Sequence, residues 1–335
     1  MGTAATVAVL LLLGTTLTHA IINGTLDGNL HPNVGVVISE VDGQKFSPCS
    51  GNLIAPTVFV GAAHCLEFIE LVGGTQVWVS FASHVDADVN FIEVSNLDTS
   101  TLIPGTLHPN PAFDVHAPDP NDVAVITFET PVEGIIPAEL PTLGLLDELG
   151  QQNGLKDQLF TVVGYGVNQR IEGGGGKTYL RDLSRRFATS GLNSLTPALL
   201  RLSTNSTKGF GEPHAADSGG GIFLGGVESN TLVAIVGLRG TPGYYQGYRL
   251  DTASARGVPL QLRYSSELGL SGEVGSRTAT RQPNRTPNKA CCEPPQPKSK
   301  KRRDKRGTIG TASRSLLDRA QPPLSHFPAR LQPRP

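Results

Sequence analysis

An all-β fold with many turns is predicted for this chain from its composition and from the spacing of its apolar runs. Glycine and proline account for 39 and 25 of the 335 residues, and only 17% of the residues are charged. Short runs rich in Val, Ile, Thr and Phe recur between turn residues, which is typical of β-barrels and β-sandwiches. The expected strands include residues 34–38, 58–63, 76–81, 91–94, 123–128, 160–165, 221–224 and 232–236. The sequence has no long helix-period stretch, apart from a candidate at 259–268.

The first 20 residues are expected to be a signal peptide. Their apolar core, residues 4–13, is too short to cross a membrane, and small residues precede the expected cut after Ala20. The absence of Lys and Arg before this core departs from the usual pattern. We therefore expect a secreted, extracellular protein that begins at Ile21, with no integral membrane segment.

Charge separates an acidic body from a basic tail. Residues 276–335 carry 15 Lys and Arg against 3 Asp and Glu, whereas residues 21–275 carry 13 against 26. Apolar runs also disappear after residue 271, so the segment 272–335 cannot offset the entropy cost of ordering and is predicted to be disordered. Its basic run, 298–306, is interpreted as a flexible tail, with polyanion binding or docking onto the acidic body as alternatives. The neighbouring Cys291 and Cys292 lack metal-ligand spacing and are interpreted as an incidental pair.

Three segments carry the residue types that catalysis by a serine nucleophile needs. They are Gly61-Ala-Ala-His64-Cys65, Asn121-Asp122-Val-Ala and Asp217-Ser218-Gly-Gly. A serine hydroxyl needs a base that takes its proton, a buried acid that orients the base, and backbone N–H groups for the oxyanion. Each segment alone also has a purely structural interpretation, as a structural histidine, a turn aspartate or a glycine-rich loop. Their joint occurrence favours a triad of His64, Asp122 and Ser218.

These segments resemble the chymotrypsin/trypsin-like serine protease family, and the resemblance covers residues 21–265. Further motifs support it: Ile21-Ile-Asn-Gly at the expected start, Cys49-Ser-Gly-Asn, His108-Pro, Gly164-Tyr-Gly166 and Pro242-Gly-Tyr-Tyr245. The resemblance implies two six-stranded antiparallel Greek-key barrels, at 21–135 and 136–271, with the active site between them.

The resemblance also implies a role for each site residue. His64 would be the general base and then the general acid, Asp122 would orient it, and Ser218 would form an acyl-enzyme. The backbone N–H groups of Ala216 and Ser218 would form the oxyanion hole. Cys49 and Cys65 would form a disulfide next to His64.

An ion pair at the N-terminus follows from the same resemblance. In the family, a freed Ile amine folds inward and pairs with the Asp that precedes the nucleophile, here Ile21 and Asp217. Because no Lys or Arg precedes Ile21, the expected signal cut would itself expose the amine. We therefore expect an enzyme without a zymogen stage.

The specificity pocket departs from the family pattern. Ala216 and Gly237 stand where the family has a Gly and often a Ser that supports the aspartate, and His214 replaces a pocket cysteine. Glu212, six residues before Ser218, takes the position at the base of the pocket, where an acid would favour Arg or Lys. A solvated loop glutamate is the alternative, and Arg239 would neutralise the charge. Gly243 completes the expected pocket.

The sequence therefore predicts a secreted, monomeric serine endopeptidase that acts on polypeptides without a cofactor or a metal. Protein inhibitors are expected as partners. The alternative is a catalytically silent homologue that uses the same fold for extracellular binding.

Overall fold

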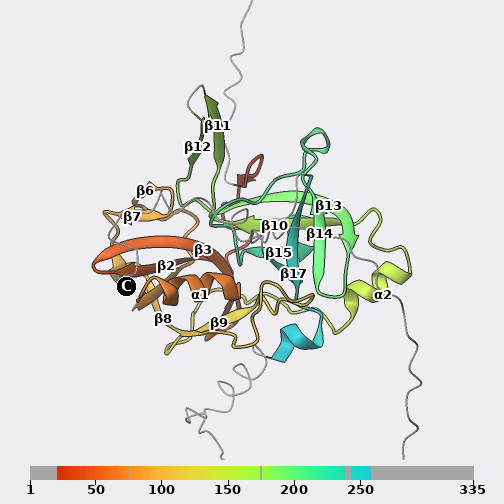
Figure 1. The fold of residues 1–335 in the computed structure, drawn as a ribbon, viewed down its shortest axis with the longest axis horizontal. Helices are drawn as coiled ribbons and strands as arrows, with labels where there is room; N and C mark the ends of the chain where they lie inside the picture. Colours follow the sequence, from red (N-terminus) through yellow and green to blue (C-terminus); the bar gives the residue numbers. More distant parts are fainter. Residues whose placement is uncertain (1–20, 75, 174–175, 238–242, 258–335) are drawn as a thin grey trace, which may run out of the picture. The chain divides into compact units, whose positions relative to one another are not determined.

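The computed structural model describes residues 21–257, except 75, 174–175 and 238–242 (Figure 1). The expected signal peptide, the basic tail with Cys291 and Cys292, the helix candidate at 259–268 and Arg239 lie outside the described residues. No helix formed by the described residues reaches the length of about 20 apolar residues that a membrane crossing needs.

Most of the described chain is antiparallel β-sheet. The strands are β1 Thr25–Leu26, β2 Val34–Val41, β3 Gln44–Ala55, β4 Val58–Gly61, β5 Gln76–Ser80, β6 Asp88–Asn90, β7 Glu93–Ser95, β8 Ile103–His108, β9 Ala124–Thr127, β10 Leu159–Gly164, β11 Gln169–Gly173, β12 Gly176–Leu180, β13 Arg186–Leu195, β14 Leu199–Ser203, β15 Gly221–Leu224, β16 Leu232–Val236 and β17 Tyr244–Arg249. The helices are α1 Ala63–Leu71 and α2 Leu145–Gln151, with 3₁₀ turns at Thr99–Thr101 and Ser206–Lys208.

Two of the sheets close into six-stranded barrels, as the resemblance implied. In the first barrel the order is β2-β5-β8-β9-β4-β3, and a β2–β3 pairing closes the ring. In the second barrel the order is β13-β10-β15-β16-β17-β14, closed by a β13–β14 pairing. Closure leaves no free edge within either ring, which removes the main route to edge-to-edge aggregation.

Short additions extend both barrels. Strands β6 and β7 continue the first sheet beyond β3, and β11 with β12 forms a separate two-stranded sheet (Figure 1). Strand β1 pairs with β13, so the segment that follows Ile21 is attached to the second barrel. The chain from 128 to 158 connects the barrels and contains α2.

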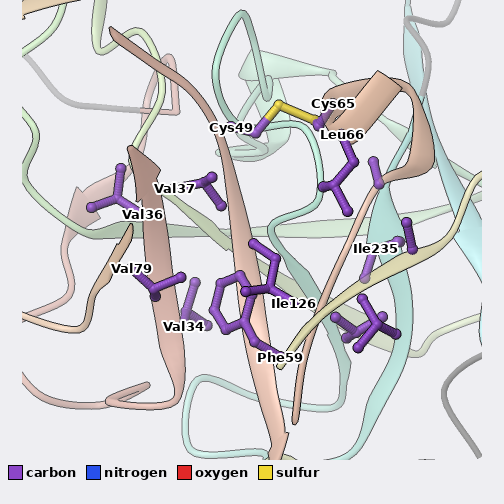
Figure 2. Packing of buried hydrophobic residues seen from close by; sticks show 14 of the residues in the cluster. Val34, Val36, Val37, Cys49, Phe59, Cys65, Leu66, Val79, Ile126 and Ile235 are labelled. Carbon is purple, nitrogen blue, oxygen red and sulfur yellow. A yellow bond between two sulfur atoms is a disulfide. The ribbon is translucent and has the colours of Figure 1, made fainter. Parts of the chain in front are cut away.

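Apolar residues fill the interior of the first barrel. Phe59 of β4 pairs with Ile126 of β9, and both are fully buried beside Val34 and Val79 (Figure 2). The Phe59 ring also contacts the ring of Phe81 edge-on, with centroids 5.8 Å apart. This packing makes the barrel wall a rigid support for the loops at its ends.

The predicted disulfide is confirmed. Cys49 of β3 and Cys65 of α1 are bonded, with their Cα atoms 6.2 Å apart (Figure 2). The bond attaches the first turn of α1 to the barrel, one residue after His64.

Candidate active site

His64 and Asp122 lie together although 58 residues separate them in the chain. The His64 ring Nδ1 is 2.9 Å from both carboxylate oxygens of Asp122. The His64 backbone N–H also donates to Asp122 Oδ1, at 3.0 Å. Since the first amides of a helix have no partner within the helix, Asp122 both orients the ring and caps α1.

The electrostatics of this pair favour the charged imidazole. Asp122 is 1% exposed, whereas the His64 side chain keeps 21% of its surface open to solvent. Burial disfavours the imidazolium, but the Asp122 charge, the hydrogen bond to it and the charge of Glu67 more than offset this. The pKa of His64 is therefore raised above its ordinary value of 6.5.

The loop that carries Ser218 is bonded to β3 of the first barrel. The Ser50 N–H donates to the Ser218 carbonyl at 2.9 Å, and the Ser50 hydroxyl donates to the Ala216 carbonyl at 3.0 Å. Asn52 Nδ2 donates to the Gly219 carbonyl at 2.9 Å. The loop therefore belongs to the second barrel in sequence but is held by the first.

Gly219 allows this loop to lie against the chain that leads to His64. Its φ is +80°, and a Cβ there would lie 2.4 Å from the Ser50 carbonyl oxygen and 2.9 Å from the Ala62 nitrogen. Only glycine tolerates both the conformation and the contact. Ser218, which is partly exposed, thus lies next to the segment that ends in His64. Within the described chain the Ser218 hydroxyl and the His64 ring are not hydrogen-bonded to each other, and such contacts often tighten only with substrate.

In the described part of the chain, two backbone N–H groups at the nucleophile candidate have no protein acceptor. Among the described residues, no acceptor takes the N–H of Ala216 or that of Ser218. Ala216 has a φ of +69°, in the left-handed region that costs a residue with a Cβ about 1–2 kcal/mol. Ala216, which stands where the resemblance predicted a glycine, thus has the backbone conformation that glycine favours.

Asp217 is fully buried behind the same loop. Its carboxylate accepts the Gly166 N–H at 2.8 Å and the His214 N–H at 2.9 Å. Cβ atoms at Gly164 and Gly166 would lie 2.4 Å from atoms of this carboxyl group, so the Gly-Tyr-Gly turn makes room for it. Burial raises the pKa of Asp217 to about 7, against the opposing effect of these hydrogen bonds and of the Arg181 charge.

Ile21 is buried in the second barrel, but it is not bonded to Asp217 in the described structure. Its side chain is 0% exposed and belongs to the core cluster of that barrel. The next residue, Ile22, exchanges two backbone hydrogen bonds with Glu212, at 3.1 and 2.9 Å. The start of the expected mature chain is therefore joined to the segment that precedes Ser218.

The residues expected in the specificity pocket are only partly defined. Glu212 is half-buried, and its backbone is fixed by Ile22. A Cβ on Gly237 would lie 3.4 Å from Asp122 Oδ2, so position 237 faces the candidate triad. Gly243 has a φ of +100° and accepts the Thr204 N–H through its carbonyl.

The sequence did not single out several residues that support this site. Ser50 and Asn52 belong to the Cys49-Ser-Gly-Asn motif. Two polar residues within a buried strand could have indicated that they hydrogen-bond to another segment. Buried Arg181 donates to the carbonyls of Tyr165 and Ser47, both at 2.6 Å. No local pattern marked Arg181, because its partners come from distant strands.

Neither the family models nor the curated proteins include a match to this sequence. Among the solved structures, an HL collagenase at 1.7 Å is matched over 75% of this chain and 100% of that chain. The sequence identity is 18% and the TM-score is 0.49. Among the described residues, no group of His, Cys, Asp and Glu is placed to hold a metal ion.

Proposed function

We propose that this protein is a secreted serine endopeptidase with the triad His64, Asp122 and Ser218. One observation carries the proposal: Asp122 is hydrogen-bonded to His64, and the Ser218 loop is held against the chain that leads into His64. The proposed base His64, its orienting acid Asp122 and the hydroxyl of Ser218 then lie in neighbouring segments where the two barrels meet. The Cys49–Cys65 disulfide supports an oxidising, extracellular location.

The proposed reaction proceeds through an acyl-enzyme. Ser218 Oγ attacks the scissile carbonyl carbon while its proton moves to His64 Nε2. The oxygen that becomes negative is accepted by the N–H groups of Ala216 and Ser218. The C–N bond then breaks, and His64 gives its proton to the leaving amine. Water, deprotonated by His64, attacks the acyl carbon. The ester bond to Ser218 then breaks, and His64 returns the proton to Ser218 Oγ.

Asp122 stabilises the imidazolium that forms in both steps. Because Asp122 is buried and His64 Nδ1 lies 2.9 Å from it, the ring keeps Nε2 on the side away from Asp122. The raised pKa of His64 has the same cause. His64 is thereby a stronger base than a free imidazole.

For substrates, we propose polypeptides with Arg or Lys at the cleavage site. Glu212 supports this preference, since it is a half-buried acidic residue six positions before Ser218 and its backbone is fixed by Ile22. Protein inhibitors of the same shape as a substrate would be further partners. Polyanion binding by the tail remains a prediction, because the tail lies outside the described residues.

A second candidate function is extracellular binding without catalysis. The φ of +69° at Ala216 favours it, because a Cβ in that position narrows the space beside the proposed oxyanion hole. The presence of all three triad residues favours the enzyme.

Fluorophosphonate labelling of the secreted protein tests the proposal. A probe that reacts only with an activated serine should label the wild-type protein and not Ser218→Ala. Ser206→Ala, which removes an exposed serine from the 3₁₀ turn Ser206–Lys208, is the control that should label normally. Absence of labelling in a folded wild-type protein would overturn the proposal and favour the binding homologue. Profiling with peptides then separates Arg and Lys from other residues at the cleavage site.

A further inference from the structure

The Asp122 carboxylate has an unusually small set of donors. His64 supplies all of the hydrogen bonds that it accepts from the described residues, through the ring and the backbone N–H. Gly237, whose Cβ position is 3.4 Å from Asp122 Oδ2, offers no side-chain donor. The orientation of Asp122 therefore depends on the loop of residues 109–121 that leads to it.

Asp119 fixes the end of this loop. Its Oδ1 accepts the Asn121 N–H at 3.2 Å and the Tyr248 hydroxyl at 2.9 Å. Its Oδ2 accepts the Ser254 hydroxyl at 2.7 Å. Asn121 has a φ of +50° and immediately precedes Asp122. A single carboxylate thus joins the turn before Asp122 to two segments of the second barrel region.

Tyr248 provides the connection to β17. Its side chain is 0% exposed, although its hydroxyl reaches Asp119 from another part of the chain, 129 residues away. The Tyr248 backbone nitrogen is 3.6 Å from the Cβ position of Gly237. Tyr248 and Gly237 therefore lie near Asp122, although both belong to the second barrel.

We propose that Asp119 and Tyr248 are positioning residues that hold Asp122 in register with His64 across the two barrels. The inference rests on the proposed function, since it concerns the alignment of the proposed triad. The hydrogen bonds of the Asp119 carboxylate fix the backbone of the turn before Asp122. They thereby orient Asp122 indirectly, whereas a side-chain donor at position 237 would orient it directly. Displacement of a catalytic group by about 1 Å can cost about 10²-fold in rate.

Tyr248→Phe tests the proposal because it removes only the hydroxyl and leaves the buried ring. The charges that act on His64 are those of Asp122 and Glu67. If Asp122 loosens, the pKa of His64 falls, because part of the attraction of the Asp122 charge is lost. NMR titration of the His64 Cε1–H resonance measures this without any activity. Turnover should fall about tenfold with KM within about twofold, a change confined to the chemical step.

Tyr245→Phe is the matched control. It removes another buried hydroxyl from the same strand, and in the described part of the chain that hydroxyl makes no hydrogen bond to Asp119 or Asp122. The His64 titration should keep its wild-type midpoint in this variant. Asp119→Ala should reproduce the effect of Tyr248→Phe, and the double variant should add little, because both changes break one connection.

Rescue by Gly237→Ser separates positioning from a general loss of stability. A Ser Cβ fits at position 237 with ordinary contact distances, and its hydroxyl is within reach of Asp122 Oδ2. Gly237→Ser should restore the His64 pKa of Tyr248→Phe, whereas Gly237→Ala should not. An unchanged His64 titration in both Tyr248→Phe and Asp119→Ala overturns the positioning role. A shifted titration in a protein that no fluorophosphonate labels would instead leave the positioning intact and reject the proposed function.

Discussion

At the scale of single residues, Asp122 has two structural roles, of which the sequence motif indicates only the first. It is the partner of the His64 ring and also the acceptor for an amide in the first turn of α1. A buried carboxylate is tolerated only where its oxygens are hydrogen-bonded or paired. The same two contacts that make Asp122 acceptable in the core also fix the orientation of the His64 ring.

Asp122→Asn should lower turnover about 10⁴-fold, because an amide cannot hold the imidazole in the required tautomer or stabilise its charge. His64 must be neutral to act as a base, so the activity of the wild-type protein falls as pH drops through the raised pKa of His64. The residual activity of Asp122→Asn should be lost on the acid side at a lower pH than the activity of the wild-type protein. The control is Asp114→Asn, an exposed residue of the same loop. A wild-type acid limb in Asp122→Asn would contradict the assignment.

The sign of the stability effect follows from the same pKa. Because the native state binds the His64 proton more tightly than the unfolded state, the pair contributes stability that is fully present below about pH 6.5. That contribution is lost as pH rises through the raised pKa of His64.

At the scale of elements, β3 and α1 explain why the site forms where it does. Strand β3, Gln44–Ala55, contains Ser47, Ser50 and Asn52, all fully buried. These polar residues weaken the strand signal in the sequence, yet they bind Arg181 and the Ser218 loop. The expected strand at 58–63 was too long: β4 ends at Gly61, and α1 begins at Ala63. The disulfide and the Asp122 acceptor favour the helical turn there.

Replacing Cys49 and Cys65 together by Ser should lower the free energy of unfolding by about 3 kcal/mol, as expected for closure of a loop of this length. The two residues are 16 positions apart. The midpoint of urea unfolding, with the slope checked for two-state behaviour, measures the effect. Dithiothreitol should lower the midpoint of the wild-type protein to that of the double variant and leave the variant unchanged. Equal midpoints of oxidised wild-type protein and variant would show that the disulfide adds no stability.

At the scale of the whole molecule, the two barrels are joined by polar groups as well as by apolar packing. Arg185, fully buried, donates to Asp27 at 2.8 Å and to the carbonyls of Val34 and Phe81 at 3.1 and 2.9 Å. Loss of one partner of such a buried pair leaves an uncompensated charge. The relative placement of the barrels, and hence of Ser218 and His64, is therefore specified by bonds with defined directions.

A free amine on Ile21 should activate the protein. Asp217 has a pKa of about 7 in the folded protein, whereas the same carboxyl group in the unfolded chain loses its proton near pH 4. The stability of the folded protein therefore falls as pH rises from about 4 to 7. A protonated Ile21 amine beside Asp217 would lower the pKa of this carboxyl group and remove that loss. A form that begins at Ile21 should label with fluorophosphonate faster at pH 7 than a form that begins at Ala20.

The alkaline limit gives a second measurement of the same pair. The activity of the Ile21 form should decline as pH rises through the pKa of the paired amine, which lies above the free value of about 8. Asp217→Asn should remove the difference between the two forms. Equal labelling rates of the Ile21 and Ala20 forms would show that the amine has no part in shaping the site.

The composition and apolar runs of the sequence predicted the β-rich fold class, and the resemblance to a known family implied the two barrels. The same resemblance implied the Cys49–Cys65 bond. A short apolar run between turn residues is a local property, so strands such as 221–224 and 232–236 were predicted with the bounds that the structure has. The fold and the disulfide are confirmed; the catalytic roles of His64, Asp122 and Ser218 stay predictions.

Only the tertiary structure decided what surrounds these residues. The second role of Asp122, the docking of the Ser218 loop on Ser50, and the contact of Asp119 with Tyr248 all join residues that are more than 50 positions apart. Side-chain hydrogen bonds of this kind depend on where closed barrels place their ends, and no periodicity in the sequence records that. Local chemistry therefore predicted the reactive groups, whereas the closure and packing of two barrels decided which groups position them.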